Sequence, residues 1–372
     1  MVNMRLPFSN KTKLLVSLFL TFSLMGCQGL FSTIADSIDD TDTCDTDTTE
    51  VTFKQVAYWI ESDPDYFEDI ADSDNDIDYS QLTHIIFGYV EVNADGSLDI
   101  DDDINDLQTV ITDIQSYGVK VIFSIGGEDS SNLQTIAADD DLSDDFINNV
   151  VDLVNEYGLD GIDLSWQFPK DDDEGELFED LVGELSSGLE DEDDDLLLTI
   201  EVVSGLDDEE DYADVIPEDV FDGVDFVNIR AFNTNNDENE DDDDDLYLTT
   251  DDMLDVIDYW TDRCLIQNKL VVGIPVYGTD SSVDDTEDYA DIVEEKSEKS
   301  IFACDDDDRA SIDGDYYYFN AIPTVYEKTE YAETYAGGVA LMSFDQDYIT
   351  DADYSLLNAI DLAIDGDDTV CD

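Results

Sequence analysis

From residue 51 onward, short β-branched apolar runs alternate with longer, acid-rich segments that have helical periodicity. The runs are nearly continuously apolar, as expected for parallel strands that are covered on both faces. The expected strands are Val56–Ile60, His84–Val90, Val119–Ile125, Gly161–Ser165, Leu196–Val203, Val224–Ile229, Leu270–Val276 and Val339–Phe344. The clearest helical patterns are Ile104–Tyr117, Asp144–Tyr157, Glu176–Leu189, Asp251–Asn268 and Ile322–Tyr335. Eight strands with crossover helices predict an α/β fold, a single-domain (β/α)8 TIM barrel.

A doubly wound open sheet is the alternative that the same alternation allows. No glycine-rich phosphate loop follows the first expected strand, which weakens that interpretation. The chain has 372 residues, of which 42% are hydrophobic, and this suits one large barrel with a sizeable core.

The charge of the chain is extreme, with 100 Asp and Glu against 13 Lys and Arg and a net charge of −87. Such a surface repels nucleic acid and anionic membranes, so neither is an expected partner. Because the acid is spread over the whole chain, we interpret it as a solvating surface suited to a salty, halophilic setting. The acidic runs lack the EF-hand spacing, and we expect no metal and no cofactor.

The N-terminus has the features of a targeting segment. Arg5, Lys11 and Lys13 precede an apolar run, Leu14–Leu24, that is too short for a confident membrane span. The following Leu-Met-Gly-Cys27 resembles a bacterial lipobox, which implies that Cys27 is acylated. We therefore expect a lipoprotein signal peptide over residues 1–27, a flexible acidic tether over 28–50 and the barrel over 51–372. The protein would be exported and lipid-anchored to the cell envelope, touching the membrane only through that anchor.

Four further cysteines remain: Cys44, Cys264, Cys304 and Cys371. An even number in an exported chain suggests disulfides, with three possible connectivities. We expect Cys44 to pair with Cys371, because the first strand enters and the last helix leaves at the closed end of a barrel. His84 is the only histidine and no CxxC motif exists, which excludes a structural zinc site and a histidine-based triad.

The segment Leu159–Pro169 carries the most chemical information. Side chains along a strand alternate faces, so Asp163, Ser165 and Gln167 point the same way. In a barrel that direction is toward the axis at the carboxyl end, where barrel enzymes keep their sites.

This segment reads D-G-I-D-L-S-W-Q-F-P and resembles the D-G-(apolar)-D-(apolar)-D-W-E-Y-P motif of the family 18 glycoside hydrolases, the chitinases. Four other segments are similar to motifs on the third, sixth, seventh and eighth strands of that family, in order: Lys120–Gly127, Val224–Ile229, Lys269–Gly278 and Gly338–Asp347. The resemblance covers residues 56–347 and implies the same barrel.

The resemblance also implies a lost activity. Members of the family protonate the glycosidic oxygen with a Glu, while the N-acetyl group of the substrate acts as nucleophile. Gln167 stands at the position of that Glu and Ser165 at the position of the Asp that orients the acetamido group. Phe232 and Asn233 replace a Tyr-Asp pair that holds the N-acetyl group, and Met342 replaces the Trp beneath the reacting sugar. We therefore expect no hydrolysis by the family mechanism, and we count Asp163 with these residues as part of a degenerate site that has no intact catalytic group.

The leading functional hypothesis is a non-catalytic barrel that binds a polysaccharide or another protein at its mouth. The expected cleft residues are Tyr58, Phe87, Ser124, Glu201, Arg230 and Tyr277. One alternative is a ligand-free structural protein of the envelope. Another is a glycoside hydrolase with relocated carboxylates, drawn from Asp163, Glu201 and Glu128.

Aligned on the family, Glu201 takes the place of a small fifth-strand residue and Arg230 the place of a sixth-strand Met. Both have inward parity on adjacent strands. Since a lone guanidinium inside a barrel is costly to desolvate, we expect Arg230 to form an ion pair with Glu201 or Asp163 that fills the old N-acetyl pocket.

Overall fold

The computed structural model of the chain describes residues 44, 52–60, 79–99, 107–127, 130–206, 210–232, 249–280, 286–295, 308–312, 315–349 and 351–367. Several residues named above lie outside these ranges: Arg5, Lys11, Lys13, Cys27, Glu128, Asn233, Cys304 and Cys371. The expected signal peptide over residues 1–27 and most of the expected tether over 28–50 also lie outside them, with only Cys44 of the tether described.

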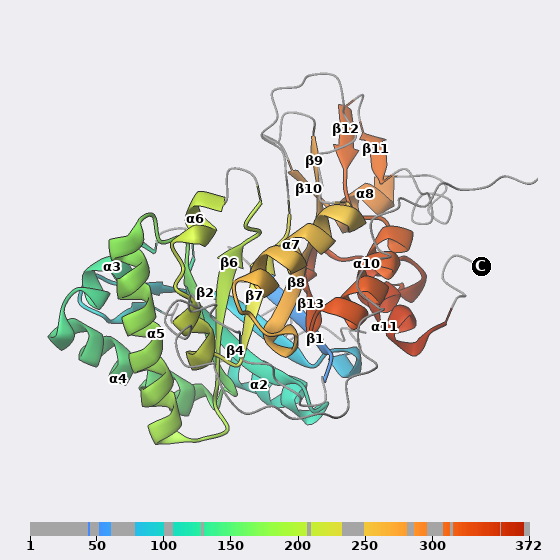
Figure 1. Cartoon of the computed structure of the whole chain (residues 1–372). Coiled ribbons are helices and arrows are strands. Elements are labelled where there is room, and N and C mark those ends of the chain that lie inside the picture. Colours follow the sequence, from blue (N-terminus) through green and yellow to red (C-terminus); the bar gives the residue numbers. More distant parts are fainter. Residues whose placement is uncertain are drawn as a thin grey trace, which may run out of the picture. The chain divides into compact units, whose positions relative to one another are not determined.

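Eight parallel strands close into a barrel, which confirms the predicted (β/α)8 fold (Figure 1). Their order is β1-β13-β8-β7-β6-β5-β4-β2, and β1 pairs in parallel with β2 to complete the circle. The barrel strands are β1 Lys54–Ile60, β2 His84–Val92, β4 Lys120–Gly127, β5 Gly161–Trp166, β6 Leu197–Val203, β7 Phe226–Arg230, β8 Leu270–Pro275 and β13 Gly338–Met342. A two-residue strand, β3 Leu98–Asp99, pairs antiparallel with the end of β2.

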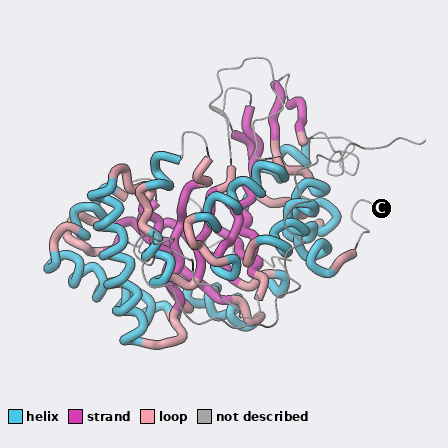
Figure 2. Tube along the Cα trace, in the orientation of Figure 1, coloured by secondary structure: helices cyan, strands magenta, loops and turns pink. Residues whose placement is uncertain are grey.

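Helices surround the strands (Figure 2). They are α2 Leu107–Ser116, α3 Ser131–Ala137, α4 Asp140–Tyr157, α5 Asp172–Glu192, α6 Glu210–Asp214, α7 Thr250–Asp262, α8 Tyr289–Glu295, α10 Ile322–Tyr335 and α11 Leu356–Asp365, with short 3-10 turns η1 Tyr79–Gln81, η4 Glu218–Gly223, η5 Gln267–Lys269, η6 Phe344–Gln346 and η7 Ala352–Tyr354. In the part of the chain that the structure describes, no helix is sufficiently long and apolar to cross a bilayer.

Some of the acidic runs begin these helices. The Asp139 side chain accepts hydrogen bonds from the first backbone N–H groups of α4, and Asp171 does the same for α5. Carboxylates at these positions satisfy orphan donors and favour the positive end of the helix dipole. The runs therefore set where helices start, in addition to solvating the surface.

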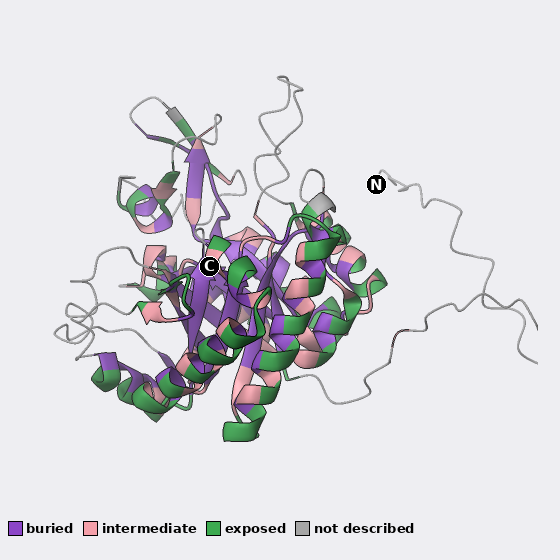
Figure 3. Cartoon of the chain, turned by 90° about the vertical axis from the view of Figure 1, so that its left-hand side faces the viewer, coloured by how far each residue is buried: buried purple, intermediate pink, exposed green. Residues whose placement is uncertain are grey.

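The apolar side chains form two layers separated by the barrel wall. Outward-facing residues of the strands pack under the helices, whose other faces are exposed (Figure 3). A smaller cluster fills the barrel interior: Val56, Tyr58, Ile86, Ile122, Phe226, Val271, Ala340 and Met342. This plug leaves the polar inward positions of β4 to β7 closer to the carboxyl ends of the strands, where they can form a site.

The segment between β8 and α10 contains strands that the sequence pattern did not predict. It folds into a four-stranded antiparallel sheet of order β10-β9-β12-β11, with α8 inserted between β10 and β11. The strands are β9 Tyr277–Asp280, β10 Thr286–Asp288, β11 Arg309–Ile312 and β12 Asp315–Tyr318. Strands of three or four residues are too short to show a clear alternation, which is why the sequence pattern missed them.

The predicted pairing of Cys44 with Cys371 is wrong, because the structure joins Cys44 to Cys264. Their Cα atoms lie 5.0 Å apart, within the range for a disulfide. Cys264 follows α7, which runs back along the barrel to the end where the next strand starts. Every helix that precedes a barrel strand ends at this same closed end, so proximity to the start of β1 does not single out the C-terminus.

Removing this disulfide should destabilise the barrel. It closes a sequence separation of 220 residues, so it restricts the unfolded chain strongly. We expect Cys264→Ser to lower the free energy of unfolding by about 2–4 kcal/mol, measured by urea denaturation under oxidising conditions. Thr261→Ser, at an exposed position near the end of α7, is the matched control and should leave the free energy of unfolding nearly unchanged. Equal stability of the Cys264→Ser variant and the unmodified protein would contradict this assignment.

Candidate functional site

The lowest polar layer of the barrel surrounds Asp163 on β5, which is fully buried. Ser124 of β4 donates a hydrogen bond of 2.7 Å to one carboxylate oxygen, and Thr199 of β6 donates one of 2.6 Å to the other. The amide of Asn228 on β7 lies 3.4 Å from the second oxygen. Burial raises the pKa of Asp163, and the hydroxyl donors oppose that rise. These buried hydrogen bonds connect β5 to β4, β6 and β7 and are sealed from solvent.

The next layer is built around Gln167, one residue beyond the end of β5. Its Nε2 donates to Glu201 Oε1 at 2.9 Å, and the Ser165 and Tyr89 hydroxyls lie 3.1 Å away. Its backbone N–H donates to Ser130 Oγ at 2.9 Å, which fixes the start of the following loop. The amide at this position therefore has a defined orientation, with its nitrogen turned toward a carboxylate.

The expected ion pair is present. Arg230 Nη1 lies 3.2 Å from Glu201 Oε1, and the two side chains are 31% and 2% exposed. The guanidinium lies over the rings of Phe168 and Phe232, with centroids 5.9 and 5.0 Å away. Burial raises the pKa of Glu201, and the positive charge of Arg230 works against that rise. This confirms the ion pair that was expected from the family resemblance, the inward parity of both residues and the desolvation cost of a lone guanidinium.

Phe232 and Met342 fill the side of the mouth next to β8. A methyl group built on Gly273 of β8 would come within 3.0 Å of the Met342 sulfur and 3.3 Å of the Phe232 ring. Met342 is only 5% exposed. The two positions where the family resemblance implies sugar-holding residues thus carry apolar side chains packed against a glycine. Asn233, the other replaced position, lies outside the described residues.

Three of the six expected cleft residues do not line the mouth. Tyr58 and Ser124 are fully buried below it. Phe87 points out of the barrel, where it stacks on Trp59 at 5.9 Å and meets Phe123 edge-on. The β2 register shifts between Phe87 and Val90. Because of this irregularity, the next aromatic side chain along the strand points into the barrel.

That aromatic is Tyr89, whose hydroxyl lies 3.4 Å from Glu201 Oε2 and accepts from the Gln167 amide. Burial raises the pKa of the Tyr89 hydroxyl, so it stays protonated and remains a donor. Phe87 and Tyr89 have the same parity, so a regular alternation of β2 would give both side chains the same direction, and the register shift between Phe87 and Val90 is what sends only Tyr89 inward.

A line of aromatic side chains follows the edge of the mouth, and we call Tyr212, Phe168, Phe232 and Tyr277 the aromatic rim. Tyr212 of α6 is 41% exposed and its ring centroid lies 6.5 Å from that of Phe168. Phe232 meets Tyr277 edge-on at 6.3 Å. The Arg230 guanidinium connects the two pairs. Tyr277 was expected here, whereas Tyr212 stands in an acidic stretch with no sequence signal.

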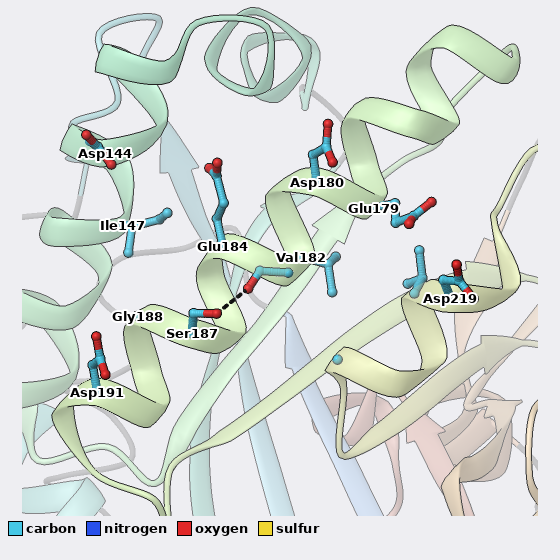
Figure 4. Close-up of a pocket in the computed structure, with 13 residues that line it drawn as sticks. Asp144, Ile147, Glu179, Asp180, Val182, Glu184, Ser187, Gly188, Asp191 and Asp219 are labelled. Atoms are coloured by element: carbon cyan, nitrogen blue, oxygen red, sulfur yellow. Dashed lines mark hydrogen bonds between the residues drawn. The ribbon is translucent and has the colours of Figure 1, made fainter.

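A hollow of about 650 Å³ lies between α4, α5 and η4 (Figure 4). Six carboxylates line it: Asp144, Glu179, Asp180, Glu184, Asp191 and Asp219. Within the described ranges, no group of three or more His, Cys, Asp or Glu side chains is placed to hold a metal ion. The hollow is an acidic surface feature and holds none of the groups predicted for the site.

A closed (β/α)8 barrel with polar side chains gathered at the carboxyl ends of its strands is the arrangement of the TIM-barrel enzymes and their relatives. Within that class, the chain belongs to family 18: the profile of the glycosyl hydrolases family 18 matches residues 55–347.

Among solved structures, a GH18 chitinase, ChiB, from Flavobacterium johnsoniae superposes with a TM-score of 0.68 at 22% identity, covering 84% of this chain and 94% of that one. YKL-39, solved in the presence of chitooligosaccharides, gives 0.66 at 18% identity over 84% and 99% of the chains. A class V chitinase of Medicago truncatula is 31% identical over 120 residues, 30% of each chain. The chitinase-like protein Idgf4 of Glossina morsitans morsitans is 24% identical over 53% of this chain and 55% of its own. The matches to these curated relatives span less than two thirds of their lengths.

Proposed function

We propose that this chain is a chitinase-like protein that binds a carbohydrate at the barrel mouth without hydrolysing it. One observation carries the proposal: the amide of Gln167, which aligns with the family's acid, donates a hydrogen bond to Glu201 instead of holding a proton for a leaving group. A general acid accounts for roughly 10²–10⁴-fold of rate by itself. Ser165 and Phe232, which align with groups that position the substrate, bring further losses.

Relocated carboxylates are the alternative, and Glu201 is the nearest candidate. Its Oε1 accepts hydrogen bonds from Gln167 and Arg230 and its Oε2 accepts one from Tyr89, so both oxygens are already engaged inside the barrel. Asp163 is fully buried and saturated by hydroxyl donors. Both observations count against hydrolysis by a relocated pair.

The aromatic rim supports binding over the ligand-free structural alternative. Aromatic faces in partly exposed positions at a barrel mouth suit stacking against sugar rings. Tyr212 is 41% exposed, and Phe168, Phe232 and Tyr277 are partly exposed beside it. A purely structural barrel has no need of such a row around its mouth.

We further propose that the protein is exported and held at the envelope by acylation of Cys27, as the lipobox-like sequence suggests. Expressed in a bacterial host, the full chain should take up a labelled fatty acid and partition with membranes. Cys27→Ala should abolish both, and a soluble, unlabelled wild-type protein would refute the anchor.

Hydrolysis is the direct test of the lost activity. We expect no product from chito-oligosaccharides above the blank, analysed by chromatography after long incubation. Ser165→Asp with Gln167→Glu should not restore measurable turnover, because Phe232 and Met342 still fill the mouth. Thermal melts would verify that the double variant is folded. Product release by the unmodified protein that Glu201→Gln removes would instead establish a relocated mechanism.

A further inference from the structure

The outer edge of the Arg230 guanidinium is available to a ligand. Its Nη1 is engaged by Glu201, and no described residue accepts a hydrogen bond from its Nη2 or Nε. The side chain is 31% exposed, while its carboxylate partner is almost completely buried. One edge of the fork is therefore anchored inside the barrel and the other faces the mouth.

The surroundings hold this fork in place. Glu201 is fixed from the inside by Gln167 and Tyr89, at 2.9 and 3.4 Å. The guanidinium also packs over the rings of Phe168 and Phe232. A guanidinium whose orientation is already set loses little entropy when it binds, and its two parallel N–H groups match a planar or tetrahedral anion.

We infer that the sugar bound at the mouth carries an anionic group, a carboxylate or a sulfate, which pairs with the outer edge of Arg230 while the sugar ring stacks on the aromatic rim. This inference rests on the proposed binding function and gives it a substrate class: acidic glycans. The pocket that the family resemblance assigns to a neutral N-acetyl group is filled by Glu201, Arg230, Phe232 and Met342.

Filling the pocket alone would not require a cation. An apolar side chain of similar volume fills a barrel without the desolvation cost of two charges. The chain has 13 Lys and Arg in 372 residues, and it places one of them at the mouth between two aromatic rings. Recognition of an anion accounts for both the charge and its partial exposure.

The net charge of −87 sets the sign of the salt dependence. At low ionic strength the whole surface repels an anionic glycan, and at about 1 M salt the screening length falls to about 3 Å, so that repulsion disappears. The contact with Arg230 is short and partly desolvated, and it is screened much less. Affinity for an acidic oligosaccharide should therefore rise from low to molar salt, opposite to ordinary charge-driven binding.

Isothermal titration of the full chain with three probes tests the inference: an oligogalacturonate, a sulfated carrageenan oligosaccharide and neutral chitohexaose. We expect binding of one or both anionic probes that strengthens with NaCl. Arg230→Lys keeps the charge and the ion pair but loses the fork, and it should weaken that binding on the order of tenfold. Lys120→Arg is the matched control, since Lys120 also pairs with a carboxylate, that of Asp160, but stands at the amino end of β4, opposite the mouth, and this variant should bind like the wild type.

A preference for the uronate identifies a carboxylate ligand and a preference for the carrageenan a sulfate ligand, and either supports the inference. Binding of chitohexaose as tight as that of the anions, or an Arg230→Lys variant that binds them unchanged, overturns it and leaves the proposed function standing. Binding of none of the three probes overturns the proposed function as well.

Discussion

The melting temperature of this protein should rise on the order of 10 °C between about 0.1 M and about 2 M NaCl, which corresponds to several kcal/mol in a domain of this size. The cause is self-repulsion. The net charge is −87, and carboxylates are frequent in places such as the hollow between α4, α5 and η4, which six of them line (Figure 4). Partial burial and the neighbouring carboxylates of Asp219 and Asp180 raise the pKa of Glu179 there.

Calorimetric or circular-dichroism melts over a series of NaCl concentrations measure this directly. Sucrose at matched osmolality is the control for general exclusion effects and should give a smaller rise. Glu179→Gln removes one charge from the hollow, so it should raise the midpoint at low salt and have little effect at high salt. A midpoint that stays flat or falls as salt increases would contradict the role assigned to the acidic surface.

The barrel was predictable because its strands are long apolar runs covered on both faces, and such runs stand out against acidic helices and loops. The positions of Glu201 and Arg230 were predictable for a related reason. Each lies on a regular strand, where alternation fixes the direction of every second side chain. The desolvation cost of an unpaired guanidinium then pointed to the partner.

Strand alternation did not predict the features of the structure that depend on irregular backbone or on short segments. Phe87 already faces out of the barrel beside the inward Ile86, and the register shift that follows it turns Tyr89 into the barrel, which no feature of the local sequence indicates. The sheet formed by β9 to β12 consists of pairings between short segments that carry too few residues for a periodic signal. Tyr212 reached the rim through the packing of a single helical turn. These features depend on tertiary contacts, which alternation and composition do not contain.

The prediction of the cysteine pairing failed for a geometric reason. The expectation used only which end of the barrel the chain termini occupy. Cys264, at the end of α7, lies at the same end, and the structure pairs it with Cys44. Knowing at which end of the barrel Cys44 lies reduced the number of candidate cysteines but did not select its partner.

Breaking the ion pair at the mouth should cost more than removing the disulfide. Glu201→Met leaves Arg230 with no carboxylate among the described residues and removes acceptors from Gln167 and Tyr89. We expect this variant to lose about 3–5 kcal/mol of unfolding free energy, as for other buried pairs that lose one partner. Arg230→Met leaves the Glu201 carboxylate, 2% exposed, without its counter-charge and should also be destabilising.

The double variant, Glu201→Met with Arg230→Met, separates the pair energy from packing. Two apolar side chains of similar volume avoid the desolvation of both charges, so the double variant should recover most of the stability that either single change loses. The difference between the double loss and the sum of the single losses, measured by urea denaturation at one salt concentration, gives the coupling between the two residues. Single variants that each cost less than about 1 kcal/mol, or losses that simply add, would mean that the two charges do not depend on each other. Recovery of stability together with loss of binding to acidic glycans would instead show that the charged pair is kept for its ligand, at a cost to the fold.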